Sequence, residues 1–255
     1  MATIQCEVAD SVATVTITNP AKRNAMSAEM WAALPDVLEE LAADSSVRVL
    51  VLTGAGDTFC AGADISELSD IEVDGVSLAI VAESALANFP KPTMAAIRGY
   101  CVGGGCQLAA ACDLRFAADG ARFGVTPAKL GIVYPASATT RLVELVGVAG
   151  AKYLLYSADL ISTEHAMRIG LIDELVAADR FADRVAEFAA TLVSRSQLTL
   201  QATKDVIGAI VGGSLTEQRM LAWRAEELRS GETAEGIAAF ADRRAPRFPW
   251  VRRSI

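Results

Sequence analysis

Short apolar runs and amphipathic segments alternate along the first three quarters of the chain. Residues 12–18 alternate β-branched residues with small or polar ones, which indicates a half-buried strand that ends at Asn19-Pro20. Residues 47–53, 92–98 and 113–117 are compact apolar runs of the kind that form fully buried strands. Because helical segments separate these runs, the pattern predicts an α/β core with crossover connections rather than a sandwich or a helix bundle.

A helix is predicted to begin after Ser27, which can cap its first turn, and Pro35 can bend it. Its apolar residues recur at helical spacing, at Met30, Leu34, Leu38 and Leu41. We expect this apolar face to lie on the sheet.

The strand pattern stops near residue 196, and the rest of the chain predicts three helices. They span residues 196–210, 214–230 and 232–242, with glycines between them. Each helix is amphipathic, but the region has little core of its own. We therefore expect residues 1–195 to form the α/β core and residues 196–255 to form a helical region that serves in assembly.

Composition narrows the classes of function. The 255 residues are 52% apolar, enough to bury a large core, and the net charge of −8 argues against a nucleic-acid partner. The longest uncharged stretch, between Arg98 and Asp113, is shorter than the roughly 18 to 20 apolar residues that span a bilayer. The first residues lack the basic and apolar segments of a secretory signal. We expect a soluble, cytoplasmic protein that does not act at a membrane.

Two glycine-containing loops each follow a predicted strand: residues 57–65 (DTFCAGADI) and residues 99–108 (GYCVGGGCQL). The second runs directly into a good helix former, so Gly104 and Gly105 would present free main-chain N–H groups where negative charge is favoured. Tight packing of a helix on the sheet is the simpler explanation of an isolated GGG. Neither a complete dinucleotide fingerprint nor a GxxxxGK[ST] phosphate loop is present.

The order of the motifs along the chain decides between these interpretations. Asn19-Pro20-x-x-x-Asn24-Ala25 is followed by both glycine loops and then by the stretch 235–248. This series resembles the crotonase superfamily, the enoyl-CoA hydratase/isomerase family, over essentially the whole chain. The resemblance implies a crotonase-like ββα spiral core with a C-terminal helical oligomerisation region, assembled as trimers that often pair as hexamers. It also implies an acyl-CoA thioester as substrate, with no separate cofactor.

The same resemblance implies an oxyanion hole for the thioester oxygen, made by the main-chain N–H groups of Ala63 and Gly104. Residues matching the family's coenzyme A contacts are Lys22, Ala25, Ala61, Asp64 and Ile65, with Phe240 and Arg243 contributed across a subunit interface. Two of these have alternative roles: Asp64 can cap the helix that follows the first loop, and Arg243 can belong to a solvated basic tail.

The sequence departs from the family where hydratases carry two glutamates. The first position is Gln107, and the second falls on Pro127, or on Ala128 in a shifted register. An amide cannot exchange a proton near neutral pH, so the paired acid/base groups for adding water are missing, and isomerisation is weakened too.

Residues 126–134 resemble instead the T-P-x-x-L-G-x-x-Y segment of methylmalonyl-CoA decarboxylases, in which Tyr134 would orient the substrate or donate a proton. That branch carries His where this sequence has Ala63, and Glu where it has Gln107, so the match is partial. Tyr134 can also be a partly buried aromatic residue without a catalytic role. Three hypotheses remain: a hydratase/isomerase-type lyase or isomerase of fatty acid metabolism, a malonyl- or methylmalonyl-CoA-type decarboxylase, and a non-catalytic acyl-CoA binder.

Other reactive side chains have simpler interpretations. The five cysteines form no CxxC pair, so we expect reduced, mostly buried thiols and no metal site; Cys101 and Cys106 are interpreted as packing residues. His165 lies in a predicted helix over residues 162–168, where a packing or surface role is expected. Lys129 is expected to be solvated.

Overall fold

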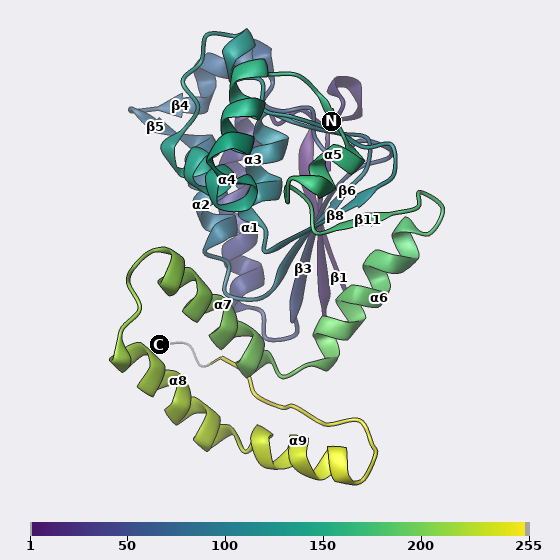
Figure 1. Ribbon diagram of the computed structural model, residues 1–255, viewed down its shortest axis with the longest axis vertical. Helices are drawn as coiled ribbons and strands as arrows, with labels where there is room; N and C mark the ends of the chain where they lie inside the picture. The colour runs from purple at the N-terminus through teal and green to yellow at the C-terminus, as the bar shows by residue number, and fades with distance from the viewer. Residues whose placement is uncertain (1, 253–255) are drawn as a thin grey trace.

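A six-stranded sheet lies at the centre of the structure, a computed structural model that describes residues 2–252 (Figure 1). Its strands are β1 (Thr3–Ala9), β2 (Val12–Thr18), β3 (Val49–Gly54), β6 (Thr93–Ile97), β8 (Leu114–Ala118) and β11 (Glu174–Val176), in the order β1-β2-β3-β6-β8-β11. Only the β1–β2 pair among these is antiparallel, and the other four pairs are parallel. Parallel neighbours require crossover connections, as the sequence predicts.

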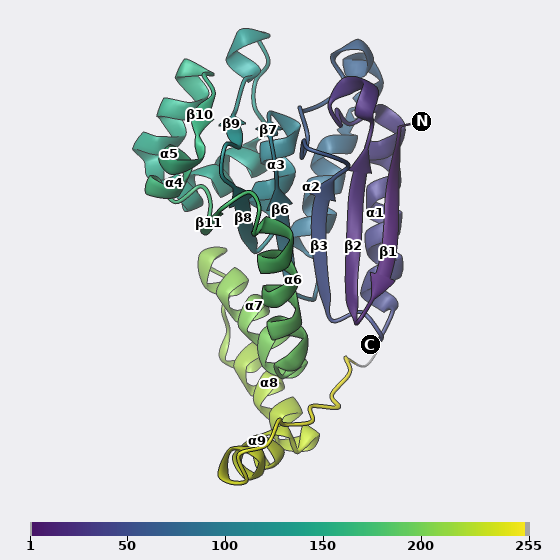
Figure 2. The same cartoon turned by 90° about the vertical axis from the view of Figure 1, so that its right-hand side faces the viewer.

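Both faces of the sheet are covered. Side chains that alternate along β3 show this directly: Leu50 and Leu52 join the main core, whereas Val49 and Val51 join a smaller cluster on the other face. The helices of the main core are α1 (Ala28–Ala43), α2 (Leu78–Ala87), α3 (Gly104–Ala111) and α4 (Ala136–Ser157). Helix α6 (Phe181–Ser194) packs on the opposite face (Figure 2). The sheet is therefore buried on both sides, as continuous apolar strands require.

Smaller elements complete the core. A second sheet has the order β10-β9-β7 and consists of β7 (Tyr100–Val102), β9 (Arg122–Gly124) and β10 (Ile161–Ser162). Short pieces are the β4–β5 hairpin (Glu72–Val73 and Val76–Ser77), α5 (Thr163–Arg168) and the 3₁₀ turns η1 (Pro20–Lys22), η2 (Ile65–Ile71) and η3 (Pro127–Lys129). The second sheet runs beside the start of α3 and thereby positions the second glycine loop.

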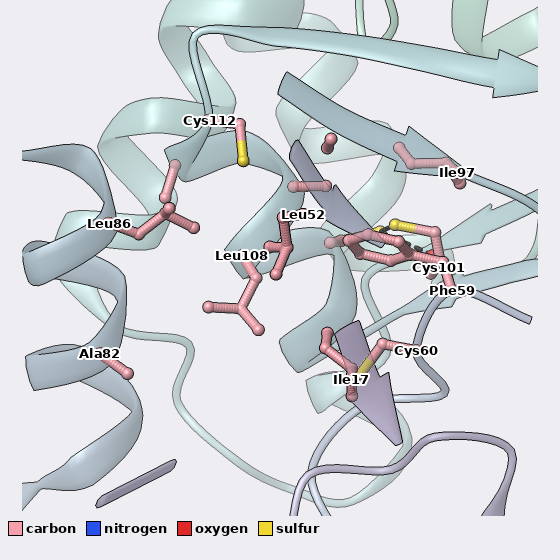
Figure 3. Packing of buried hydrophobic residues seen from close by; sticks show 14 of the residues in the cluster. Ile17, Leu52, Phe59, Cys60, Ala82, Leu86, Ile97, Cys101, Leu108 and Cys112 are labelled. Carbon is pink, nitrogen blue, oxygen red and sulfur yellow. Dashed lines mark hydrogen bonds between the residues drawn. The ribbon is translucent and has the colours of Figure 1, made fainter. Parts of the chain in front are cut away.

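The main core forms where α2 and α3 meet the sheet. Figure 3 shows Leu86 of α2 and Leu108 of α3 gathered around Leu52 of β3, and all three are fully buried. Helix α1 adds its predicted face, because Met30, Leu34, Leu38 and Leu41 are all buried. Its cap is also as predicted: the Ser27 side chain accepts a hydrogen bond from the Met30 N–H at 3.2 Å.

The C-terminal region extends away from the sheet as three helices, α7 (Gln197–Val211), α8 (Glu217–Ser230) and α9 (Glu232–Ala241) (Figures 1 and 2). Their positions confirm the three predicted segments. They leave large apolar side chains exposed, among them Ile207, Ile210, Leu221, Leu228, Ile237 and Phe240. This exposure is consistent with an assembly role, which stays a prediction. No helix within residues 2–252 is long and apolar enough to cross a membrane.

Candidate active site

The two glycine loops lie side by side, although about forty residues separate them in the sequence. The Cys60 N–H donates to the Tyr100 carbonyl at 2.9 Å, and the Val102 N–H donates back to the Cys60 carbonyl at 3.0 Å. Figure 3 shows Cys60 next to Phe59 and Cys101, deep in the core. This short parallel bridge holds the first loop against the start of α3.

The second loop needs glycine where it approaches the first. A Cβ atom on Gly105 would lie 2.4 Å from the Cys60 carbonyl oxygen, closer than side-chain carbons approach backbone. A Cβ atom on Gly104 would lie 2.9 Å from the ring of the fully buried Trp31 and 3.3 Å from the Ala63 nitrogen. Tight packing therefore explains part of the GGG motif, and it also brings Gly104 next to Ala63.

Neither Ala63 nor Gly104 uses its main-chain N–H group inside residues 2–252. Ala63 is bracketed by two hydrogen bonds to Met26: the Met26 N–H donates to the Gly62 carbonyl, and the Asp64 N–H donates to the Met26 carbonyl, each at 2.8 Å. In such a parallel bridge the intervening residue turns its own N–H away from its partner. Gly104 is the first residue of α3, where a helix offers no internal acceptor.

Two asparagines explain the N-P-x-x-x-N-A motif. The Asn24 side chain donates to the carbonyls of Ala55 and Thr58, at 2.9 and 2.6 Å, and accepts from the Asn19 N–H at 3.0 Å. Asn19 in turn donates through its side chain to the Ala25 carbonyl at 2.8 Å. Both side chains are buried, and together they brace the segment that leads into Met26 and the first loop.

The residues matching the family's coenzyme A contacts fall into two groups. One group lies in or beside the first loop and consists of Lys22, Ala25, Ala61, Asp64 and Ile65. The Lys22 ammonium forms an ion pair with the Asp64 carboxylate, and it also donates to the Ser66 hydroxyl at 3.0 Å. The side chain of Ile65 is 66% exposed, so it is available to a ligand.

Asp64 also caps η2, because its carboxylate accepts from the Ser66 N–H at 3.1 Å, which confirms its alternative role. The Lys22 ammonium is the main cause that lowers the pKa of the Asp64 carboxyl, and the bonds from Ser66 lower it further.

Phe240 and Arg243 lie elsewhere. They belong to α9 and the residues just after it, at the end of the molecule away from α3 (Figures 1 and 2). A single chain does not bring them to the glycine loops, so their expected contact with coenzyme A would require a second chain.

The Gln107 side chain meets a carboxylate that the sequence analysis missed. Its Nε2 donates at 2.9 Å to Glu83, which lies on α2 and is fully buried. Glu83 also accepts from the Ser137 hydroxyl at 2.8 Å and from the Arg141 Nε at 2.7 Å, both on α4. The sequence gives one indication of this contact: Glu83 is an acid inside the apolar run LAIVAESALA, and a buried carboxylate requires a polar partner.

Tyr134 is partly buried against the main core. Burial, and to a smaller extent the neighbouring Cys106 and Glu83, raises the pKa of the Tyr134 hydroxyl well above its usual value. At neutral pH this hydroxyl keeps its proton, so it can donate a hydrogen bond but cannot act as a base. Pro127 begins the short turn η3, which places an imino acid and no carboxylate at that position.

The remaining candidates have structural roles. Burial raises the pKa of Cys60 to about 12 and that of Cys101 well above its usual value, so these remain thiols. The Cys106 thiol donates to the Cys101 carbonyl at 2.8 Å, as a packing residue can. Lys129 is exposed and 3.6 Å from Asp159. His165 packs near Tyr153, with 5.5 Å between ring centroids.

Comparison with known proteins assigns the chain to a family. The family model described as enoyl-CoA hydratase/isomerase matches residues 7–250. The chain belongs to the enoyl-CoA hydratase/isomerase family. Its fold is therefore the crotonase fold that the resemblance implied.

Individual members of the enoyl-CoA hydratase/isomerase family support this assignment. The chain is 34% identical to (E)-benzylidenesuccinyl-CoA hydratase of Thauera aromatica, over 96% of this chain and 98% of that protein. It is 36% identical to short-chain-enoyl-CoA hydratase of Clostridium acetobutylicum, over 77% of each. A crystal structure of a family member superposes with a TM-score of 0.95 at 38% identity, covering 99% of this chain and 100% of that one.

Replacing Lys22 by Met should raise the pKa of Asp64 toward its ordinary value, because the Lys22 ammonium is the main cause of its depression. A carboxyl with a lowered folded pKa adds stability above its unfolded pKa of about 3.9. That contribution disappears as the pH falls through the folded value. The difference in unfolding free energy between wild type and Lys22→Met should thus be largest near neutral pH and shrink below about pH 4.

Chemical denaturation at several pH values measures this difference. Lys129→Met is the matched control, because it removes an equally exposed lysine whose partner Asp159 is itself exposed. A Lys22→Met difference that does not change with pH would contradict the assigned role of the ion pair.

Proposed function

We propose that this chain is an enzyme that binds an acyl-CoA thioester and stabilises negative charge on the thioester oxygen with the N–H groups of Ala63 and Gly104. The observation that carries the proposal is that, within residues 2–252, each of two adjacent loops has an N–H group with no hydrogen-bond partner, and that a Cβ on Gly104 would lie 3.3 Å from the Ala63 nitrogen. Both residues are partly exposed, so a ligand can reach these N–H groups and replace the water that would otherwise bind them.

The chemistry follows from where the charge develops. When the bond order of the thioester carbonyl falls, electrons move onto its oxygen and produce an enolate or a related oxyanion. Two donors that are already in place stabilise this charge without any reorganisation. The start of α3 adds the positive end of a helix dipole at Gly104.

The reaction at the acyl group depends on the acid/base positions of the family, where this chain has Gln107 and Pro127 and thus no carboxylate. This favours decarboxylation as the second candidate activity. In that reaction the bond between the α-carbon and the carboxylate breaks, and its electron pair enters the enolate as CO2 leaves. The α-carbon then takes a proton from water or from the Tyr134 hydroxyl. No base is needed, whereas hydration requires one group to take a proton from the attacking water and a proton to be delivered to the α-carbon.

The coenzyme A part would bind beside Lys22, Ala25, Ala61, Asp64 and Ile65. Phe240 and Arg243 of a second copy would complete it, in a trimer or a hexamer built on the exposed apolar faces of α7 to α9. In this arrangement the basic group of Arg243 meets a coenzyme A phosphate.

A panel of thioesters tests the proposed activity. Crotonyl-CoA, malonyl-CoA and methylmalonyl-CoA are incubated with the protein and followed by mass spectrometry. We expect either gain of water from crotonyl-CoA or loss of CO2 from one of the malonyl esters. Tight binding with no product would instead support the non-catalytic binder, and failure to bind any thioester would contradict the proposal.

Replacing Gly104 by Pro should remove the N–H group from the proposed oxyanion hole. Pro is well tolerated at the first position of a helix, and no internal hydrogen bond is lost there. Steady-state kinetics on the thioester that is converted should show kcat reduced by about 10²- to 10³-fold, the usual cost of losing one such donor.

Gly104→Ala is the matched control, because it adds the same Cβ beside Trp31 but keeps the N–H group. The Pro variant should be much slower than the Ala variant, with equal circular dichroism spectra for both. Equal rates for the two variants would show that the Gly104 N–H group takes no part in catalysis.

A further inference from the structure

Glu83 stands at the centre of a polar cluster enclosed by apolar helices. Its carboxylate accepts from three donors that come from two helices: Gln107 on α3, and Ser137 and Arg141 on α4. The Arg141 guanidinium is 2.7 Å away and provides the counter-charge. In all three hydrogen bonds the Glu83 carboxylate is the acceptor.

This cluster fixes the orientation of the Gln107 amide. An acceptor-only partner has to face the NH2 end of that amide, so the carbonyl oxygen Oε1 is turned away from Glu83. Within residues 2–252, Oε1 accepts no hydrogen bond, and it is not among the buried atoms that are sealed from solvent without a partner. Gln107 therefore keeps one free acceptor.

The position of this acceptor relates it to the glycine loops. Gln107 lies one turn after Gly104, and its N–H donates to the Gly103 carbonyl at 3.0 Å. Tyr134 packs partly buried against the main core, and Glu83 is one of the groups that raise the pKa of its hydroxyl. The fixed acceptor of Gln107 thus lies on the same helix as the unused N–H group of Gly104.

We propose that Glu83 is a positioning residue that holds Gln107 with Oε1 directed at the acyl group, so that this point of the site recognises a hydrogen-bond donor. The inference rests on the proposed function of the two glycine loops. Such a donor is present in a hydroxyacyl-CoA thioester, or in the water that accompanies an enoyl-CoA, ligands that the proposed function already includes. The carboxylate of a malonyl ester is itself an acceptor, so a confirmed preference for a donor at this point would count against decarboxylation, the second candidate activity.

Two thioesters that differ in one hydroxyl test the inference: 3-hydroxybutyryl-CoA and butyryl-CoA, with affinities measured by isothermal titration calorimetry. Wild type should bind the hydroxy ester about three- to tenfold more tightly, the usual net value of one hydrogen bond. In Glu83→Gln the partner can donate as well as accept, so the Gln107 amide is free to rotate. The ratio of the two affinities should then fall toward one.

Two further variants separate positioning from stability. Asp173→Asn removes the charge of a different carboxylate–arginine pair, that of Asp173 with Arg115, and should keep the preference. Gln107→Met removes the acceptor and should abolish the preference even if Glu83→Gln does not fold.

The outcomes distinguish the two proposals. An unchanged preference in folded Glu83→Gln or in Gln107→Met would overturn the role assigned to Glu83, as would equal binding of both esters by wild type. Failure of wild type to bind either ester would instead overturn the proposed function.

Discussion

Main-chain pairing between two distant loops is the constraint on which the site depends. Cys60 exchanges hydrogen bonds with Tyr100 and Val102, and Met26 exchanges them with Gly62 and Asp64. The bonds of Met26 fix the peptide planes on both sides of Ala63, and the bonds of Cys60 fix the chain just before Gly104, all without using any side chain. The donors are therefore in position before a ligand arrives, which is the condition under which electrostatic stabilisation is most effective.

The fold protects this pairing by burial. The cysteines at the junction have no solvent access, and their raised pKa values keep them as small apolar thiols. Glycine is required at Gly105 because any side chain would collide with the Cys60 carbonyl. Since the proposed donors are main-chain groups, the side chains around them can vary without removing either N–H group.

Much of the fold could be predicted from local sequence patterns. Strand β2, helix α1 with its Ser27 cap, and the three C-terminal helices have periodic patterns that need no tertiary information. Strand β1 was missed because it is an edge strand whose residues are mostly exposed, so it has no clear alternation. Strand β11 has only three residues, too few for any period to show.

The site was predictable only in part. Both glycine loops are visible in the sequence, because each follows a predicted strand and the two stand in a series of motifs that resembles one family. Glu83 is not, because its partners Gln107, Ser137 and Arg141 are 24, 54 and 58 residues away along the chain. Such an ion pair depends on how α2, α3 and α4 pack, and no local pattern encodes that packing.

The most direct test of the central claim is the infrared frequency of a bound thioester carbonyl, measured with butyryl-CoA labelled with ¹³C at that carbon. If the N–H groups of Ala63 and Gly104 both donate to this oxygen, the bond is polarised, and its stretching band should move to lower frequency than in water. A carbonyl band at or above the frequency in water for the bound ester would contradict the account.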